Sequence, residues 1–241
     1  MRQLTLALAD GAVVAKRNLI KIKRVPEVLI WTTMSPIMFV LLFAYVFGGS
    51  IDVPGVNYRE YLIAGIFAQT VVFGSTFTGA GLAEDMTKGV IDRFRSLPMA
   101  RSAVLVGRTA SDIFYNSISI LVMSITGLLV GWRIRGSAFE AIGGFLLLLL
   151  FAYAFSWIMA YVGLKVGSVE IVNNASFMFI MPLTFIANTF VWSDNLPGPL
   201  QTFAEWNPVS AVAQAAREAF GNTGSLPPSD AWPVQHPYAY T

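Results

Sequence analysis

The chain has 241 residues, of which 55% are hydrophobic and 12% are charged, and its formal net charge is +2. This composition is too apolar for a soluble domain and is typical of a membrane protein with several spans. The near-neutral charge gives no reason to expect a nucleic-acid partner. Cysteine is absent, which excludes disulfides and thiolate metal sites.

The first 27 residues predict an amphipathic helix on the membrane surface, because one face of residues 3–25 is apolar and basic residues gather toward the end. The chain then turns into the membrane at Pro26. We expect this helix to anchor the chain and to contribute Arg17 and Lys21 to the contact with a partner. The apolar face consists of Leu4, Leu8, Ala12, Ala15, Leu19 and Ile22.

Five apolar segments within residues 28–192 are long enough to cross a bilayer, which takes about 20 residues in a helix. None of them contains an acidic or basic side chain. The sequence therefore predicts an all-α polytopic membrane protein with a single transmembrane domain over residues 1–241. The segments are Val28–Phe47, Tyr61–Ala83, Ile113–Trp132, Ile142–Leu164 and Ala175–Trp192.

A charged loop, residues 84–112, separates the second and third apolar segments. Read as one helix, its first part has an apolar stripe, because Met86, Val90, Phe94 and Leu97 recur at helical spacing. Pro98 is expected to end this helix, since proline cannot continue the backbone ladder. A charged helix with one apolar stripe at a membrane face predicts a docking element for a partner in the water.

The basic residues indicate which side of the membrane this loop occupies. Residues 1–27, 84–112 and 165–174 hold twelve of the sixteen Lys and Arg residues, while acidic residues divide evenly between the two sides. Loops rich in Lys and Arg stay in the cytoplasm. The sequence therefore predicts a cytoplasmic N-terminus and a cytoplasmic charged loop.

The tail, residues 193–241, predicts short helices that are too polar to cross the membrane. Asn207 and Pro208 form an N-cap followed by proline at the first helical position, and Gly221 is placed to end that helix. We expect re-entrant or interfacial helices on the outer face. Three tryptophans, Trp192, Trp206 and Trp232, are expected at headgroup depth.

No catalytic constellation can be assembled from the sequence. It contains no metal-binding HExxH motif, no G-x-S-x-G nucleophile motif and no G-x-x-x-x-G-K-[ST] phosphate loop. The predicted spans offer only neutral polar groups, whereas ion-coupled carriers usually keep an ionisable residue at membrane depth. We therefore expect a chain that is not an enzyme, binds no cofactor or metal, and draws its energy from another polypeptide.

The chain resembles the permease subunits of ABC-2-type transporters, most closely the daunorubicin-resistance (Drr) type. The resemblance spans nearly the whole chain and rests on three features in order: the amphipathic N-terminal segment, the charged loop, and the Asn207 helix with Arg217. The family has six spans, so a sixth is expected beyond Thr241. The resemblance places the chain as a multi-pass protein of the bacterial cytoplasmic membrane.

The resemblance also implies that the charged loop couples the permease to an ABC ATPase dimer, which carries ATP and Mg²⁺. A second permease copy or a paralogue would complete the transporter in the bilayer. In this interpretation Phe94 and Ile91 insert into a groove on the ATPase, and Arg93 and Arg95 pair with its acidic residues. The coupling residues are Glu84, Asp85, Lys88, Gly89, Ile91, Arg93, Phe94, Arg95, Leu97 and Pro98.

Spans two and five line the cargo path in similar transporters, which implies roles for Gln69, Phe73, Phe185 and Asn188. Walls rich in Phe and Met suit drugs, lipids and other hydrophobic or amphiphilic compounds. Two alternatives remain open. One is an ABC-2 exporter of polysaccharide or glycolipid, and the other is a non-transporting scaffold that recruits a cytosolic protein.

Overall fold

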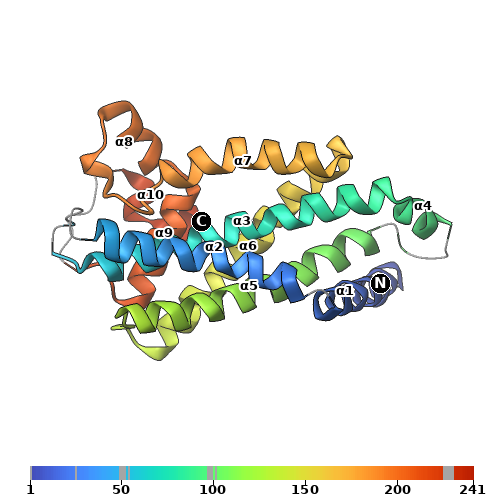
Figure 1. Ribbon diagram of the computed structural model, residues 1–241, viewed down its shortest axis with the longest axis horizontal. Helices are drawn as coiled ribbons and strands as arrows, with labels where there is room; N and C mark the ends of the chain where they lie inside the picture. The colour runs from blue at the N-terminus through green and yellow to red at the C-terminus, as the bar shows by residue number, and fades with distance from the viewer. Residues whose placement is uncertain are drawn as a thin grey trace. The chain divides into compact units, whose positions relative to one another are not determined.

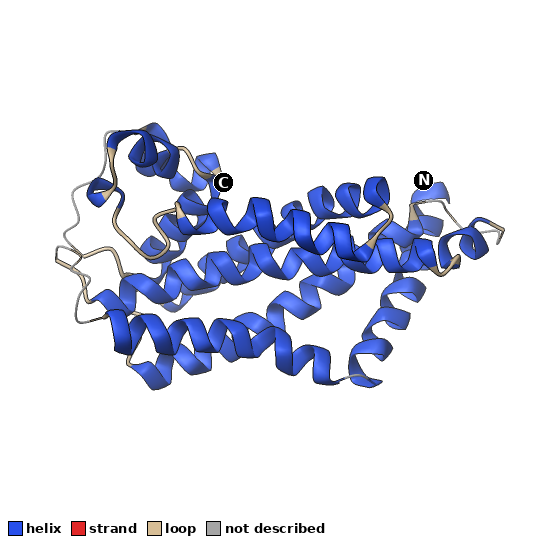
Figure 2. Ribbon diagram, turned by 45° about the horizontal axis from the view of Figure 1, so that its top comes forward, coloured by secondary structure: helices blue, strands red, loops and turns tan. Residues whose placement is uncertain are grey.

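The computed structural model describes residues 2–24, 26–48, 53, 55–96, 100, 102–224 and 231–241. These residues form helices joined by loops, with no strand among them (Figure 2). Figure 1 labels most of the helices in chain order. They are α1 (Arg2–Arg24), α2 (Pro26–Leu41), the π-helix η1 (Leu42–Phe47), α3 (Tyr58–Thr87), α4 (Val90–Arg95), α5 (Ala103–Val130), α6 (Ala138–Val166), α7 (Val169–Phe185), the 3₁₀ turn η2 (Ser193–Asn195), α8 (Gly198–Glu205), α9 (Pro208–Phe220), α10 (Trp232–Gln235) and α11 (Pro237–Tyr240).

Three helices, α3, α5 and α6, are long and apolar enough to cross a membrane, and two shorter apolar helices cover Thr33–Val46 and Val169–Phe185. This confirms an all-α membrane protein. The third span differs from the prediction, because α5 begins at Ala103 rather than at Ile113. A helical hydrogen-bond ladder need not stop where the apolar residues stop. The helix therefore includes Arg108 and Asp112, which the sequence placed in the loop before the third span.

The fifth predicted span ends early. We expected helix up to Trp192, but α7 ends at Phe185 and an irregular segment, residues 186–192, follows. Side chains of other elements donate hydrogen bonds to backbone carbonyls at the end of α7 and beyond it. Asn207 Nδ2 donates to the Leu183 carbonyl at 2.7 Å, and Tyr61 Oη donates to the Asn188 carbonyl at 2.6 Å. These bonds satisfy polar groups that would otherwise be costly in an apolar environment.

The described chain falls into two compact units, each containing parts of several helices. Unit 1 comprises Met1–Thr32, Val72–Ile118 and Ala152–Met178. Unit 2 comprises Thr33–Val71, Ser119–Phe151 and Phe179–Thr241. Unit 1 contains α1, α4 and the charged loop, whereas unit 2 contains the tail helices α8–α11.

In unit 1, α3 and α6 cross at small residues. A Cβ on Gly79 would lie 2.6 Å from the Met159 carbonyl oxygen, and a Cβ on Gly163 would collide with the backbone of Gly79. Ser75 Oγ adds a hydrogen bond of 3.2 Å to the Ala152 carbonyl. Glycine at both crossing positions therefore lets the two backbones approach closely, as is common between membrane helices.

In unit 2, α9 is the central buried element, and its caps match the prediction. The side chain of Asn207 accepts a hydrogen bond from Val209 N, Pro208 occupies the first turn, and Gly221 ends the helix with φ of +70°. Aromatic rings surround the end of α9 at centroid distances of 4.9–5.9 Å. They belong to Phe67, Trp132, Phe145 and Phe220.

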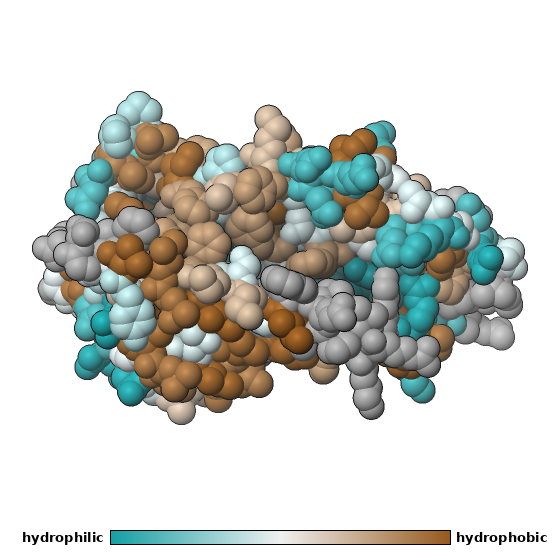
Figure 3. All heavy atoms as spheres, viewed as in Figure 1, coloured by the Kyte–Doolittle hydropathy of each residue, from teal (hydrophilic) through white to brown (hydrophobic). Residues whose placement is uncertain are grey.

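The surface of unit 2 carries many exposed apolar side chains on α5, among them Leu121, Ile125 and Leu129. Figure 3 shows such apolar surface as brown spheres around the lower left of the view, where Figure 1 draws the end of α5. This surface suits contact with lipid tails. Trp206 and Trp232 are also half-exposed, whereas Trp192 is buried against Tyr61. Their expected position at headgroup depth stays a prediction.

Candidate functional site

The charged block folds as two helices rather than the single helix expected. α3 continues to Thr87, and α4 begins at Val90. Between them Gly89 has φ of +64°, a left-handed conformation that side-chain-bearing residues rarely adopt. The block therefore turns at Gly89, which separates Met86 from the apolar residues of α4.

The end of α3 is stabilised by its own charged side chains. Lys88 Nζ lies 2.5 Å from Glu84 Oε1, one helical turn earlier, and Thr87 Oγ1 donates to the Glu84 carbonyl at 2.9 Å. The hydrogen bond to Glu84 raises the pKa of Lys88 above its ordinary value. Both residues were predicted to belong to the coupling region, and here they fix the last turn of α3.

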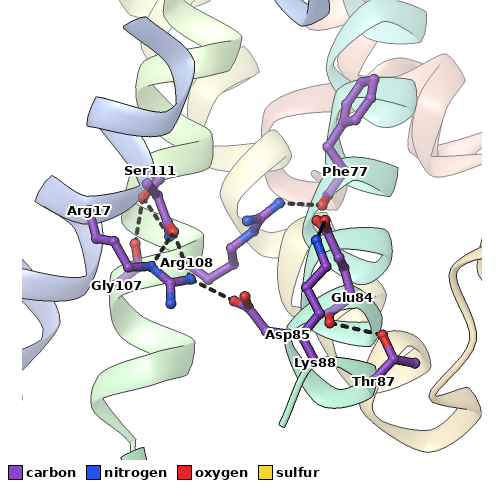
Figure 4. A network of polar contacts seen from close by, with 10 residues as sticks. Arg17, Phe77, Glu84, Asp85, Thr87, Lys88, Gly107, Arg108 and Ser111 are labelled. Carbon is purple, nitrogen blue, oxygen red and sulfur yellow. Dashed lines mark hydrogen bonds and ion pairs between the residues drawn. The ribbon is translucent and has the colours of Figure 1, made fainter. Parts of the chain in front are cut away.

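Arg17 of α1 connects the N-terminal helix to both helices of the charged block. Its Nη2 lies 2.7 Å from Asp85 Oδ2 at the end of α3 (Figure 4). Its guanidinium also lies over the ring of Phe94 in α4, at 5.4 Å from the centroid. Arg17 was predicted to contact a partner, but in this structure it joins three elements of its own chain. We refer to Arg17, Asp85 and Phe94 as the latch.

Two further polar contacts hold α1 to the region around α5. The Asn18 side chain is buried and donates from Nδ2 to Ser111 Oγ at 3.3 Å. At the other end, Asp10 Oδ2 accepts from the backbone N–H of Ala100 at 2.9 Å, just before α5 begins. Figure 1 shows α1 beside this end of α5. α1 is therefore fixed along its length and not only at Arg17.

The backbones of α1 and α5 come together at two glycines. A Cβ on Gly107 would lie 2.5 Å from the Gly11 carbonyl oxygen and 2.6 Å from Val14 Cβ. Val14 itself is only 2% exposed. A larger residue at position 107 would therefore push α1 away from α5.

The remaining predicted coupling residues are only partly placed by the structure. Ile91 and Phe94 are half-buried, whereas Arg93 is exposed on α4. The backbone of Arg95 ends α4 and that of Lys21 lies in α1, but their side chains are outside the described residues. Leu97 and Pro98 also lie outside them, so the predicted role of Pro98 in ending the helix stays a prediction.

The predicted cargo-path residues belong to two different units. Phe73 belongs to unit 1, whereas Gln69, Phe185 and Asn188 belong to unit 2. Within unit 2, Phe185 packs against Phe190 at a centroid distance of 4.9 Å. Gln69 and Asn188 are buried, and the Asn188 carbonyl accepts a hydrogen bond from α3. Their role in a cargo path stays a prediction.

The sequence named Arg217 as part of the helix that follows Asn207, but it did not show that this arginine is buried. Its side chain is fully buried in unit 2 and donates to the carbonyls of Tyr61 at 3.1 Å and Asn188 at 2.6 Å. Its guanidinium also lies 3.5 Å from the centroid of the Tyr61 ring. Arg217 therefore joins α9 to α3 and to the irregular segment after α7.

Sequence reasoning missed Asp10, Asn18 and Ser111. For Asn18 a signal was present, because it is a polar residue beside Leu19 on the apolar stripe of the first helix. For Asp10 and Ser111 the sequence carried none, since their partners are 90 and 93 residues away in the chain. Long-range pairs of this kind depend on how the helices pack.

These observations define a class: an all-α, multi-pass membrane protein in which an N-terminal helix is latched to a short charged helix between two spans. The chain belongs to the ABC-2 type transporter family, whose profile matches residues 11–220. The resemblance suggested by the sequence is thereby confirmed.

Curated relatives agree with this assignment. The chain is 34% identical over 210 residues to the daunorubicin resistance ABC transporter permease protein DrrB1 of Streptomyces coeruleorubidus, covering 87% of this chain and 74% of that protein. It is 23% identical over 214 residues to the doxorubicin resistance ABC transporter permease protein DrrB of Mycobacterium tuberculosis, covering 86% and 74%. It is 22% identical to the putative transport permease ycf38 of Cyanophora paradoxa, covering 89% and 75%.

Proposed function

We propose that this chain is the membrane-spanning permease subunit of an ATP-driven exporter that moves hydrophobic or amphiphilic compounds out across the bacterial cytoplasmic membrane. Membership of the ABC-2 family supports the transport role. Two relatives are named for resistance to daunorubicin or doxorubicin, which supports an amphiphilic cargo. Hydrolysis of ATP, with its Mg²⁺, would take place on a partner and not on this chain.

The latch is the single observation that carries the coupling part of the proposal. α4 is a short helix that projects between two spans, and the side chain of Arg93 is exposed on it. Arg17 holds the Phe94 ring from the α1 side, which fixes the orientation of α4. A fixed helix with an exposed charge and a half-buried aromatic anchor is suited to dock in a groove of an ATPase.

The proposed complex contains an ATPase dimer and a second permease, either another copy of this chain or a paralogue. The N-terminus and α4 would face the cytoplasm, as the distribution of Lys and Arg predicts. On the side of the cargo, unit 2 contains a cluster of aromatic rings at centroid distances of 4.3–6.2 Å, formed by Phe39, Phe43, Phe185 and Phe190. Rings of this kind favour an apolar cargo over a sugar polymer.

The test uses the chain co-expressed with the ABC ATPase encoded nearest its gene. Phe94→Ala and Arg93→Glu are compared with Phe139→Ala, which changes the most exposed phenylalanine of the described residues, at the start of α6. Loss of a hot-spot anchor should weaken ATPase co-purification by about tenfold or more. ATP-dependent uptake of a fluorescent amphiphile into inverted vesicles should fall in parallel, while Phe139→Ala behaves as wild type.

Unchanged ATPase association in both α4 variants would refute the coupling role. A stable partner without nucleotide hydrolysis would instead indicate the scaffold function. ATP-dependent export of a glycolipid, without export of simpler amphiphiles, would indicate the polysaccharide or glycolipid alternative.

A further inference from the structure

α3 and α5 meet in unit 1 along a polar seam of three successive turns. In each turn a polar side chain of α5 faces α3, and two of the three facing residues on α3 are glycines. The pairs are Arg108 against Gly81, Asp112 against Thr78, and Asn116 against Gly74.

Asp112 is the central residue of this seam. Its carboxylate accepts a hydrogen bond from Thr78 Oγ1, and the two side chains are 3% and 0% exposed. Among the described residues it forms no ion pair. An ionised carboxylate can accept up to about four hydrogen bonds, so one neutral hydroxyl leaves most of this capacity unused. A buried acidic residue within a membrane helix is a candidate functional group for this reason.

Asn116 adds a second unused acceptor one turn further along α5. Its Nδ2 donates to the Asp112 carbonyl at 2.9 Å, and its side chain is 2% exposed. Its Oδ1 has no donor among the described residues and points at α3, where a Cβ on Gly74 would lie 2.5 Å away. The seam therefore holds two acceptor groups with unused capacity in neighbouring turns, and one buried donor without a partner among the described residues, Arg108 Nε, lies one turn before Asp112.

Arg108 forms no ion pair with Asp112 among the described residues. It lies one turn before Asp112, but its Nη2 donates to the Phe77 carbonyl at 2.6 Å (Figure 4). Its guanidinium occupies the space above Gly81, where any Cβ would collide with it. The nearest cation on the same helix therefore donates a hydrogen bond to a backbone carbonyl of α3.

From these two acceptors with unused capacity we propose that the α3–α5 seam is a recognition site for the cationic group of the cargo, with Asp112 as its counter-ion and Asn116 Oδ1 as a second acceptor. The proposal rests on the proposed export function and names the cargo class as amphiphilic amines. A protonated amine would bring a positive charge into direct contact with Asp112 and would offer N–H donors to both acceptors. Entry of the amine requires α3 and α5 to part at Thr78 and Gly74.

The position of Asp112 also connects the site to α1. Ser111, the preceding residue, accepts the hydrogen bond from Asn18 of α1. Ser111 contacts α1, and the next residue, Asp112, contacts α3. A displacement of α1 that moves Ser111 would therefore also move Asp112. An arrangement of this kind lets a movement at the coupling region change the affinity for cargo.

The test compares two fluorescent cargoes in vesicles containing the chain and its ATPase: dansylcadaverine, whose primary amine is protonated, and its N-acetyl derivative, whose amide is neutral. Asp112→Asn keeps an acceptor for Thr78 and removes the charge. Asp112→Glu restores the charge, and Glu170→Gln removes an exposed carboxylate of unit 1 as the matched control. ATPase co-purification is measured in every variant.

We expect Asp112→Asn to lower ATP-dependent transport of the amine by about tenfold or more, the ratio that corresponds to about 1.4 kcal/mol. The acetylated compound should be transported as before, Asp112→Glu should recover part of the amine transport, and Glu170→Gln should change nothing. Equal loss of both cargoes would overturn the proposal and identify the seam as a structural staple between α3 and α5. Unchanged transport of the amine would also overturn it. Failure of the wild-type protein to transport either compound, despite a bound ATPase, would count against the proposed function itself.

Discussion

Removal of the Arg17 side chain should loosen the attachment of α1 to the rest of unit 1, and the open state can be measured with a single thiol. The chain contains no cysteine, so Val14→Cys introduces one label site without background. Val14 is 2% exposed, and its thiol should react only when α1 opens. When opening is fast relative to labelling, the labelling rate follows the population of the open state.

The expected magnitude follows from the two contacts of Arg17. The ion pair with Asp85 is partly solvated, with side-chain exposures of 39% for Arg17 and 13% for Asp85. Such a pair contributes about 0.2–1 kcal/mol, and a cation–π contact like that with Phe94 contributes about 0.5–1 kcal/mol. Arg17→Ala should therefore raise the labelling rate of Val14→Cys by about 3- to 30-fold, the factor that about 0.7–2 kcal/mol represents.

A matched control and a double-mutant cycle make this prediction specific. Lys16→Ala removes a neighbouring exposed cation and should leave the rate within a factor of about two. In the background of Asp85→Asn, the effect of Arg17→Ala should shrink by about 0.2–1 kcal/mol, because the two residues contact each other. An unchanged labelling rate in Arg17→Ala, or strictly additive effects with Asp85→Asn, would refute the latch.

Three other predictions test the packing and the orientation. Gly163→Leu should lower the thermal stability of the purified protein, since overpacking costs about 1–3 kcal/mol, whereas Gly143→Ala, which meets no atom within 4 Å, should not. Asn207→Ala should destabilise unit 2 by about 1–2 kcal/mol in denaturant unfolding, because it removes both an N-cap and a bond to α7. Cysteines at Ser96 and Ser137 should label from opposite sides of intact cells, and labelling of both from outside would contradict the predicted orientation.

Hydropathy and the capping residues made much of the helical fold predictable from the sequence. α3, α5 and α6 follow from apolar runs longer than about 18 residues. The caps of α9 follow from Asn207, Pro208 and Gly221, because each has a local conformational preference that does not depend on the rest of the chain. Gly89 was placed in the predicted coupling region, but its sequence context did not reveal that it would separate two helices.

The errors share one physical cause, which is that tertiary contacts extend or interrupt helices irrespective of local hydropathy. The charges of Arg108 and Asp112 suggested a loop, yet α5 includes both because α3 supplies their hydrogen-bond partners. The apolar run up to Trp192 suggested a full span, yet Tyr61 and Arg217 bind the backbone carbonyl of Asn188 and replace helical bonds there. Neither set of partners can be identified from local sequence.

The geometry of α1 argues for a reversible clamp rather than a passive membrane anchor. An anchor needs only an apolar face toward lipid, but α1 also directs Asp10, Arg17 and Asn18 at other parts of unit 1. Each of these polar contacts is individually weak, at about 0.5–1.5 kcal/mol. A partner that binds α4 more tightly when Phe94 is free could therefore separate α1 from α4, because only the difference in affinity between the two states matters. Since Asn18 bonds Ser111, that separation would act directly on the turn of α5 that carries Asp112.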